Sequence, residues 1–143
     1  MARRGENSRD SRHYYDWLEF AAEDLHCAEV LLADRQCLLA AGFHCQQAME
    51  KALKAHILFQ TGSPVDGHNI TWLCRTAGRL DGRVLDWLSY TPAFNRLYIE
   101  TRYPSDTALK YSYEDVQAVY VVAQELYSYI CKQIYEDPDP ERE

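Results

Sequence analysis

The sequence predicts an all-α protein of the helical-bundle class. Apolar residues recur at spacings of three and four in several segments, and short breaks containing Gly, Pro or Asp separate these segments. At 143 residues the chain fits one domain with a sizeable core. We expect a flexible basic arm at residues 1–12, the folded domain at 13–135 and a disordered acidic tail at 136–143.

The first expected helix spans about 14–33. Its apolar stripe steps by four, four, three and four residues, the pattern of a helix with one buried face. Asp24 lies away from this stripe, where it is either solvated or part of a polar site. The stripe consists of Trp17, Ala21, Leu25, Ala28 and Leu32.

The central helix is expected at about 38–60, and the rest of the chain is organised around it. The stretch from Phe43 to Ala55 contains no Gly, Pro or β-branched residue and is rich in helix formers. The preceding break at 34–36 is short, so the first two helices should be antiparallel neighbours. One face is small and apolar, and we expect it in the core: Ala41, Cys45, Ala48, Met49, Ala52, Leu53, Ala55 and Ile57.

The opposite face of the central helix is polar, and it has two interpretations. It is either a solvated surface, with Glu50 and Lys54 as an i,i+4 ion pair, or a binding site. Its members are His44, Gln47, Lys51 and Lys54, with Glu50 at the edge.

Two short helices are expected next, at 70–80 and 84–90. His68 precedes the first of them, either as a helix-start residue that bonds backbone amides or as a site residue. Asp81 and Gly82 separate the two helices, and Thr91-Pro92 starts a further helical turn. The residues expected to face inward are Leu73, Ala77 and Leu80 in the first helix and Leu85 and Leu88 in the second.

A rigid corner is expected at Arg102 and Tyr103. Because Tyr103 precedes a proline, the helix must end near residue 101 or 102. A guanidinium and a phenol ring held there suit phosphate binding and stacking. The alternative is structural, with Arg102 clamping Asp106 or Glu100 and Tyr103 filling the core.

The last helix is expected from residue 113 or 114 to about 135. Its seam alternates spacings of four and three, as in a bundle helix. Glu114 and Asp115 favour its first turn through the helix dipole. The seam consists of Val116, Tyr120, Ala123, Tyr127, Ile130 and Ile134.

Composition excludes several classes of function. A net charge of −7 argues against a general nucleic-acid binder. No apolar run is long enough for a membrane span or a signal peptide, so we expect a cytoplasmic protein without membrane contact. The five cysteines form no CxxC pair, which favours reduced thiols and no metal site. Gly-rich phosphate loops and nucleophile-plus-base arrangements are also missing from the sequence.

Three separated motifs across 14–135 resemble the HEPN domains (higher eukaryotes and prokaryotes nucleotide-binding). They are the opening Trp17-Leu18-Glu19, the pattern Phe43-His44-xx-Gln47-xx-Glu50-Lys51, and Tyr98 to Asp106 with its Arg102-Tyr103-Pro104; a Gly67-His68 turn adds to them. The resemblance implies an up-and-down bundle of four main antiparallel helices plus a short helix. This bundle is similar to the helical domain of kanamycin-type nucleotidyltransferases.

Many HEPN domains are metal-independent ribonucleases with an Arg followed, after four to six residues, by His. In this sequence no histidine follows Arg102, and Arg9 and His13 are too close together. Enzymatic activity is therefore left open, with a non-catalytic domain favoured. The alternatives are a divergent ribonuclease toxin that uses Arg102 with His44 or His68, and a dimeric protein-interaction module without a ligand.

The favoured function is nucleotide binding together with a separately encoded minimal nucleotidyltransferase, as in toxin–antitoxin pairs. No cofactor follows from the residues; the resemblance implies ATP or another nucleotide, with RNA less favoured. A homodimer is also expected, since half-exposed tyrosines suit a subunit interface. The candidate nucleotide-binding residues are His44, Gln47, Lys51, His68, Arg102 and Tyr103, with Asp24 and Asp106 as further candidates.

Overall fold

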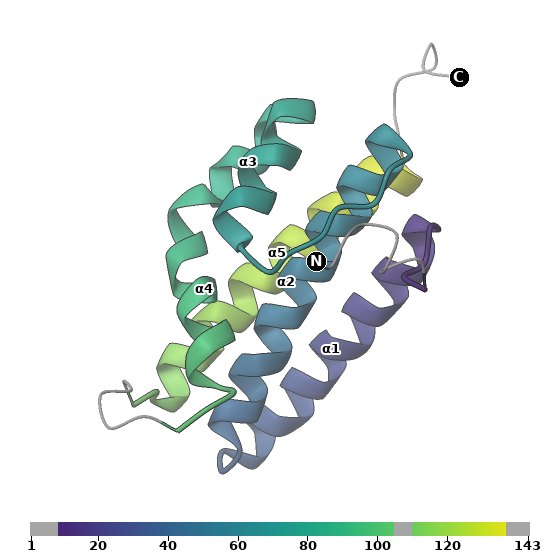
Figure 1. Ribbon diagram of the computed structural model, residues 1–143. Coiled ribbons are helices and arrows are strands. Elements are labelled where there is room, and N and C mark those ends of the chain that lie inside the picture. Colours follow the sequence, from purple (N-terminus) through teal and green to yellow (C-terminus); the bar gives the residue numbers. More distant parts are fainter. Residues whose placement is uncertain (1–8, 105–109, 137–143) are drawn as a thin grey trace.

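A computed structural model describes residues 9–104 and 110–136, so Asp106, most of the basic arm and the acidic tail beyond Glu136 lie outside the described residues. The elements of the described ranges are six helical segments in an all-α bundle (Figure 1). In chain order they are α1 (Tyr14–Asp34), α2 (Leu38–Thr61), α3 (Ile70–Leu80), the 3-10 helix η2 (Gly82–Tyr90), α4 (Thr91–Glu100) and α5 (Tyr113–Tyr135).

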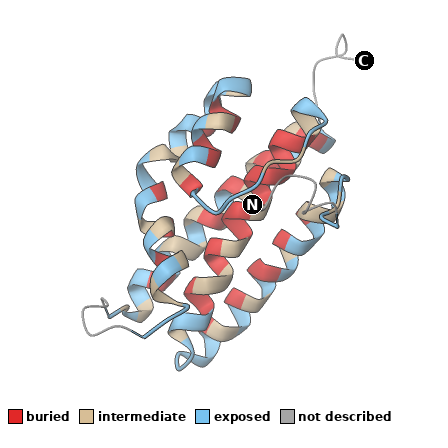
Figure 2. Cartoon of the chain, viewed as in Figure 1, coloured by how far each residue is buried: buried red, intermediate tan, exposed pale blue. Residues whose placement is uncertain are grey.

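Helix α2 is the centre of the molecule, as predicted. It packs against α1, α3, α4 and α5, and Figure 2 shows buried residues along most of its length. The expected apolar face is confirmed, because each of its eight residues is at most 1% exposed. The remaining surface of α2 is more deeply buried than a solvated face would be, since Gln46, Glu50, Lys54 and His56 are buried as well.

The turn between α1 and α2 is held by a residue in a left-handed conformation. Arg35 ends α1 with φ 64°, and its backbone N–H bonds the carbonyls of Leu31 and Leu32. Its guanidinium lies 3.9 Å from the centre of the Tyr113 ring at the start of α5. The short connection makes α1 and α2 antiparallel neighbours, as expected from the sequence (Figure 1).

The α3–η2 region departs from the sequence prediction in two ways. The expected helix at 84–90 is a 3-10 helix that begins at Gly82, where the Asp81 side chain accepts from the Arg83 N–H. The inward placement of Leu80 and Leu85 is wrong, because each side chain is 44% exposed. Leu80 is the last residue of α3, and Leu85 lies over Gly78 of α3 instead of entering the core.

Helix α5 completes the bundle against α1 and α2. Its start is fixed by a capping box in which Ser112 and Asp115 each accept the backbone N–H of the other. Most of the predicted seam is buried, whereas Tyr120 and Tyr127 are half-buried. None of the helices in the described part of the chain is long and apolar enough to cross a membrane.

Candidate functional site

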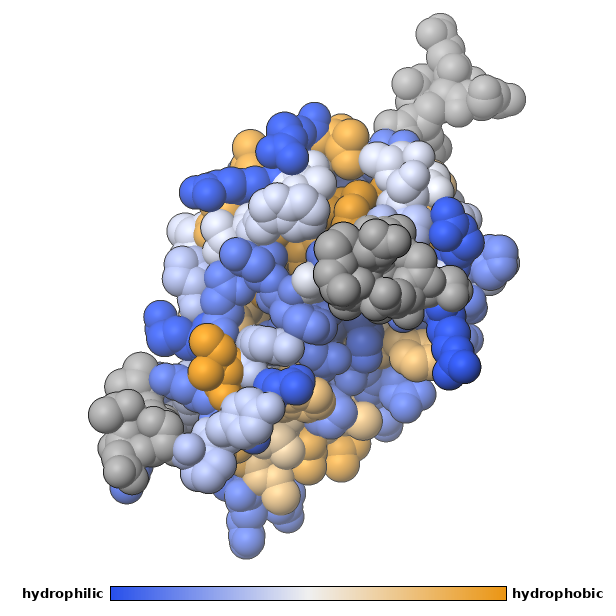
Figure 3. Space-filling model, in the orientation of Figure 1, coloured by the Kyte–Doolittle hydropathy of each residue, from blue (hydrophilic) through white to orange (hydrophobic). Residues whose placement is uncertain are grey.

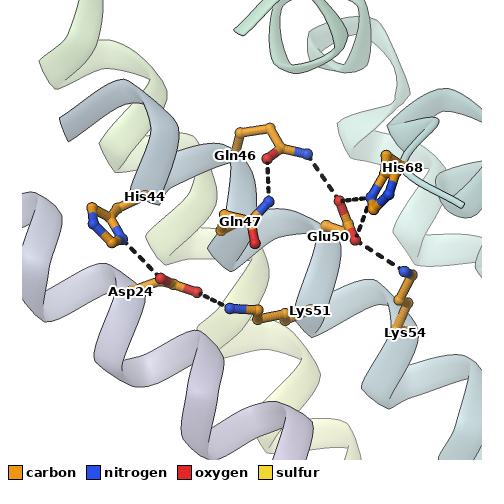
Figure 4. Close-up of polar contacts among 8 residues, drawn as sticks. All are labelled: Asp24, His44, Gln46, Gln47, Glu50, Lys51, Lys54 and His68. Atoms are coloured by element: carbon orange, nitrogen blue, oxygen red, sulfur yellow. Dashed lines mark hydrogen bonds and ion pairs between the residues drawn. The ribbon is translucent and has the colours of Figure 1, made fainter. Parts of the chain in front are cut away.

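Two polar networks flank α2, and the first joins it to α1 (Figure 4). The Asp24 carboxylate accepts a hydrogen bond from His44 Nδ1 at 2.8 Å and from Lys51 Nζ at 2.7 Å. Asp24 is only 7% exposed, so its solvated interpretation is wrong. Because a buried carboxylate needs donors to offset its lost hydration, the two partners on α2 explain why Asp24 tolerates this position.

The second network surrounds Glu50. Its carboxylate accepts from Gln46 Nε2 at 3.0 Å, Lys54 Nζ at 2.9 Å and His68 Nδ1 at 3.0 Å (Figure 4). Gln47 adds a further bond by donating to Gln46 Oε1 at 2.8 Å. The i,i+4 pair of Glu50 and Lys54 is confirmed, but its placement on a solvated face is wrong because both side chains are buried.

Aromatic rings of α1 cover the two lysines. The ammonium of Lys51 lies 5.6 Å from the centre of the Phe20 ring, and that of Lys54 lies 5.6 Å from Trp17. Each ammonium therefore has a carboxylate on one side and a π-face on another, a combination that favours charge in a partly dry setting.

A stack of planar groups lies at the end of α4. The His68 ring stacks on Tyr98, with centres 4.6 Å apart and planes 17° apart, and the Arg102 guanidinium is 4.8 Å from the centre of Tyr98. The N-cap of α3 is Asn69, which accepts from the Trp72 N–H, so the helix-start interpretation of His68 is wrong. Tyr103 is 67% exposed, so the core interpretation of that residue is also wrong.

Glu100, one of the two expected partners of Arg102, accepts a hydrogen bond from the hydroxyl of Tyr111 at 2.5 Å. Burial and this bond to a carboxylate raise the pKa of Tyr111 to about 12. The other expected partner, Asp106, lies outside the described residues.

A third polar cluster was not predicted from the sequence. It joins α2, the α3–η2 junction and α5. Asp81, between α3 and η2, accepts from Tyr129 of α5 at 2.7 Å and contacts Nε2 of buried His56 at 3.0 Å. Burial pushes the pKa of Asp81 upward, but the bonds from Tyr129 and His56 outweigh this and hold it below its usual value.

The structure brings together most of the predicted site. Asp24, His44 and Lys51 form one network, and Gln47 and His68 belong to the other. Arg102 reaches His68 through Tyr98, whereas Tyr103 is adjacent only in sequence to this stack. Hydrophilic side chains gather over α2 between α1 and α4 in the space-filling view (Figure 3). Six residues of this region were not among the predicted site residues: Trp17, Phe20, Gln46, Glu50, Lys54 and Tyr98.

Two buried thiols are unsuited to act as nucleophiles. Burial raises the pKa of the Cys45 thiol to about 12 and that of Cys74 to about 11, so both remain protonated at neutral pH. Within residues 9–104 and 110–136, no group of three or more His, Cys, Asp or Glu side chains is placed to hold a metal ion.

Comparisons with known proteins place this arrangement in a family. The crystal structure of ST0689, an archaeal HEPN homologue, has a TM-score of 0.68 and 24% identity, covering 85% of this chain and 98% of that one. The crystal structure of TT1696 from Thermus thermophilus has a TM-score of 0.71 and 26% identity, covering 86% and 99%. A comparison with curated proteins gives no match. The sequence profile of the HEPN domain matches residues 14–134, and the chain therefore belongs to the HEPN domain family.

Proposed function

We propose that this protein is a non-catalytic, nucleotide-binding HEPN domain that acts with a separately encoded minimal nucleotidyltransferase, as one half of a toxin–antitoxin pair. The observation that carries the proposal is the stack of His68, Tyr98 and Arg102, in which His68 also belongs to the Glu50 network. An exposed guanidinium next to stacked rings suits a phosphate and a base together.

The partner part of the proposal is supported by two exposed side chains that are close in sequence to Tyr98 and Arg102. Ile99 is 64% exposed and Tyr103 is 67% exposed at the end of α4. Exposed aromatic and apolar residues beside an arginine are typical of the central part of a protein interface. A nucleotide held at the stack would then lie where a nucleotidyltransferase could reach it.

A calorimetric titration with ATP, GTP and their monophosphates, with and without magnesium, tests nucleotide binding. We expect Arg102→Ala to weaken binding about tenfold, because one charge-assisted contact to phosphate is lost. Arg79→Ala is the matched control, since Arg79 is also exposed and its guanidinium contacts Thr76 of its own helix. No binding at millimolar ligand, or equal losses in both variants, would overturn the proposal.

Co-expression with a nucleotidyltransferase encoded next to this gene tests the partner. We expect the two chains to co-elute in gel filtration and Ile99→Asp to separate them while leaving the fold intact, because a charge would be placed in the interface. If the two proteins elute separately, the proposal that this chain acts with a nucleotidyltransferase is wrong.

A second candidate function is a divergent metal-independent ribonuclease. It is favoured by the contact between Glu50 and Nδ1 of His68, because a carboxylate on one ring nitrogen orients the other for proton transfer. RNA cleavage in the presence of a chelator, abolished by His68→Ala and by Arg102→Ala, would support this function. Cleavage that survives both changes would exclude it.

A further inference from the structure

A pocket of about 470 Å³ lies at the N-terminal end of α1, and the residues preceding the helix form one of its walls. Ser11 Oγ donates to Asp16 at 2.7 Å, and Trp17 Nε1 donates to the Ser11 carbonyl at 2.9 Å. These bonds hold Ser11 against the first turn of α1. The volume falls within the ~300–1,000 Å³ typical of small-molecule sites. Seven residues line the pocket: Arg9, Asp10, Ser11, Asp16, Trp17, Phe20 and Lys51.

The lining combines aromatic faces with both signs of charge. Trp17 and Phe20 stand one turn apart on the same face of α1, which provides a stacking surface. Lys51 donates to Asp24 Oδ2 at 2.7 Å, and its ammonium carries three protons, so donors remain for a ligand. Asp16 holds the Ser11 hydroxyl through Oδ2, and each carboxylate oxygen accepts more than one bond.

This set of groups suits guanine better than adenine. Guanine presents the O6 and N7 acceptors, which suit a lysine ammonium, and an N–H edge that suits a carboxylate. Adenine places an amino group where guanine has O6, and that donor would face the ammonium. An aromatic floor, an ammonium and a carboxylate in one pocket therefore match guanine.

We infer that this pocket holds the base of a guanine nucleotide, stacked on Phe20 and Trp17 with Lys51 at O6 and Asp16 at the N–H edge. Arg9 at the pocket wall then faces the phosphate side of the ligand. None of the stack residues His68, Tyr98 and Arg102 lines this pocket, so the inference adds a second, guanine-selective base site to the proposed nucleotide binding.

Guanosine and adenosine monophosphates titrated into the full-length protein test the inference. The readout is the set of three indole N–H signals in NMR spectra, with Trp17 assigned through Trp17→Phe. We expect GMP to shift the Trp17 signal, whose N–H bonds Ser11 at the pocket wall, while Trp72 on α3 and Trp87 in η2 stay unmoved. AMP should need at least about tenfold higher concentrations.

Two variants test the pocket residues by calorimetry. Phe20→Ala should weaken GMP binding about tenfold through lost stacking. Val30→Ala is its control, because Val30 is also on α1 and is 55% exposed against 61% for Phe20. Asp16→Asn should reduce the preference for GMP over AMP by about tenfold, since an amide no longer offers two acceptors.

The outcomes separate this inference from the proposed function. Nucleotide binding that is weakened by Arg102→Ala, but leaves Trp17 unmoved and is unchanged by Phe20→Ala, overturns the pocket and leaves the proposed function standing. Equal affinity for AMP and GMP overturns the guanine assignment. An absence of binding to any nucleotide overturns both.

Discussion

Glu50 carries the largest number of side-chain contacts among the residues of the polar face. Gln46, Lys54 and His68 all direct donors at its carboxylate. A buried ion pair contributes little net stability in itself, but breaking it by removing one partner is costly. Glu50 and Lys54 should therefore be replaceable together far more easily than one at a time.

Replacing Lys54 by Met should lower the free energy of unfolding by about 3 kcal/mol, because Glu50 then stays buried without its cation. The double change Glu50→Gln with Lys54→Met should recover most of that loss. Urea denaturation measures both. Lys132→Met, at an exposed position on α5, is the control and should change stability by less than about 0.5 kcal/mol. Additive losses in the double variant would mean that the two side chains do not interact.

The cysteines should differ in reactivity according to their burial. Cys37 is exposed at the start of α2, whereas burial raises the pKa of Cys45 to about 12 and of Cys74 to about 11. At about pH 8 a disulfide reagent should modify Cys37 rapidly and reach Cys45 and Cys74 only on unfolding. Mass spectrometry of the modified peptides, with Cys37→Ser as control, checks this order. Rapid labelling of Cys45 in the folded protein would contradict it.

At the residue scale the sequence indicated which side chains share a face but not how deeply they lie. The helical wheel of α2 placed His44, Gln47 and Lys51 together, and these residues do take part in the polar networks. The burial of Glu50 depends on His68, which comes from a loop after the helix. The periodicity of one helix cannot predict a contact with a residue outside that helix. The i,i+4 spacing of Gln46, Glu50 and Lys54 could have predicted that these three side chains interact.

At the element scale, Leu85 of η2 packs so closely against Gly78 of α3 that position 78 has no room for a side chain. A Cβ on Gly78 would lie 2.3 Å from Leu85 Cδ2 and 2.6 Å from its Cγ. We expect Gly78→Ala to destabilise the protein by about 1–2 kcal/mol, because overpacking outweighs the better helix propensity of Ala. Adding Leu85→Ala should remove the clash and restore much of the loss. Thermal unfolding of the two variants, with Leu85→Ala alone as control, measures this. A stable Gly78→Ala variant would show that Leu85 moves freely.

Helix bounds were predictable because starts and stops depend on local chemistry. Helix α3 occupies the predicted 70–80, and α5 begins at Tyr113 behind its capping box. The type of helix at 82–90 was not predictable, since its 3-10 geometry depends on Asp81 as a cap and on packing against α3. For the same reason the side of η2 that faces inward could not be assigned from the positions of Leu85 and Leu88 alone.

At the scale of the whole molecule, Asp81 connects α2, the α3–η2 junction and α5 through His56 and Tyr129. Its pKa is held below the usual 3.8 in the folded protein. A group with a lowered folded pKa adds stability above its unfolded pKa, and this stability is lost as the pH falls through the folded pKa. The contribution of Asp81 should therefore be complete at neutral pH and should decline below about pH 4.

Asp81→Asn should cost about 1–2 kcal/mol at neutral pH, because hydrogen bonds to a charged acceptor are weakened. The difference from the unchanged protein should shrink as the pH falls below about 4. Urea denaturation at several pH values measures it, with the exposed Asp34→Asn as the control. A difference that stays constant down to about pH 2.5 would mean that Asp81 is not ionised in the folded protein.

The bundle as a whole was predictable because its helices are amphipathic and its connections are short. The candidate site was predictable only in part, since it combines one helix with a loop and the end of another. The Tyr98 stack illustrates this limit. His68 and Arg102 are 34 positions apart in the sequence, and both contact Tyr98 because α3 and α4 pack beside α2.

The three residues between α1 and α2 also affect the order in which the protein assembles. Closing so short a connection loses little chain entropy, so the α1–α2 hairpin can form early and as soon as it leaves the ribosome. Helix α5, by contrast, is synthesised last and must return to α2 across the whole α3–α4 region. During that interval the apolar side of α2 that awaits α5 stands uncovered. Slow synthesis of the C-terminal third would therefore lengthen the period in which the nascent chain is prone to aggregate.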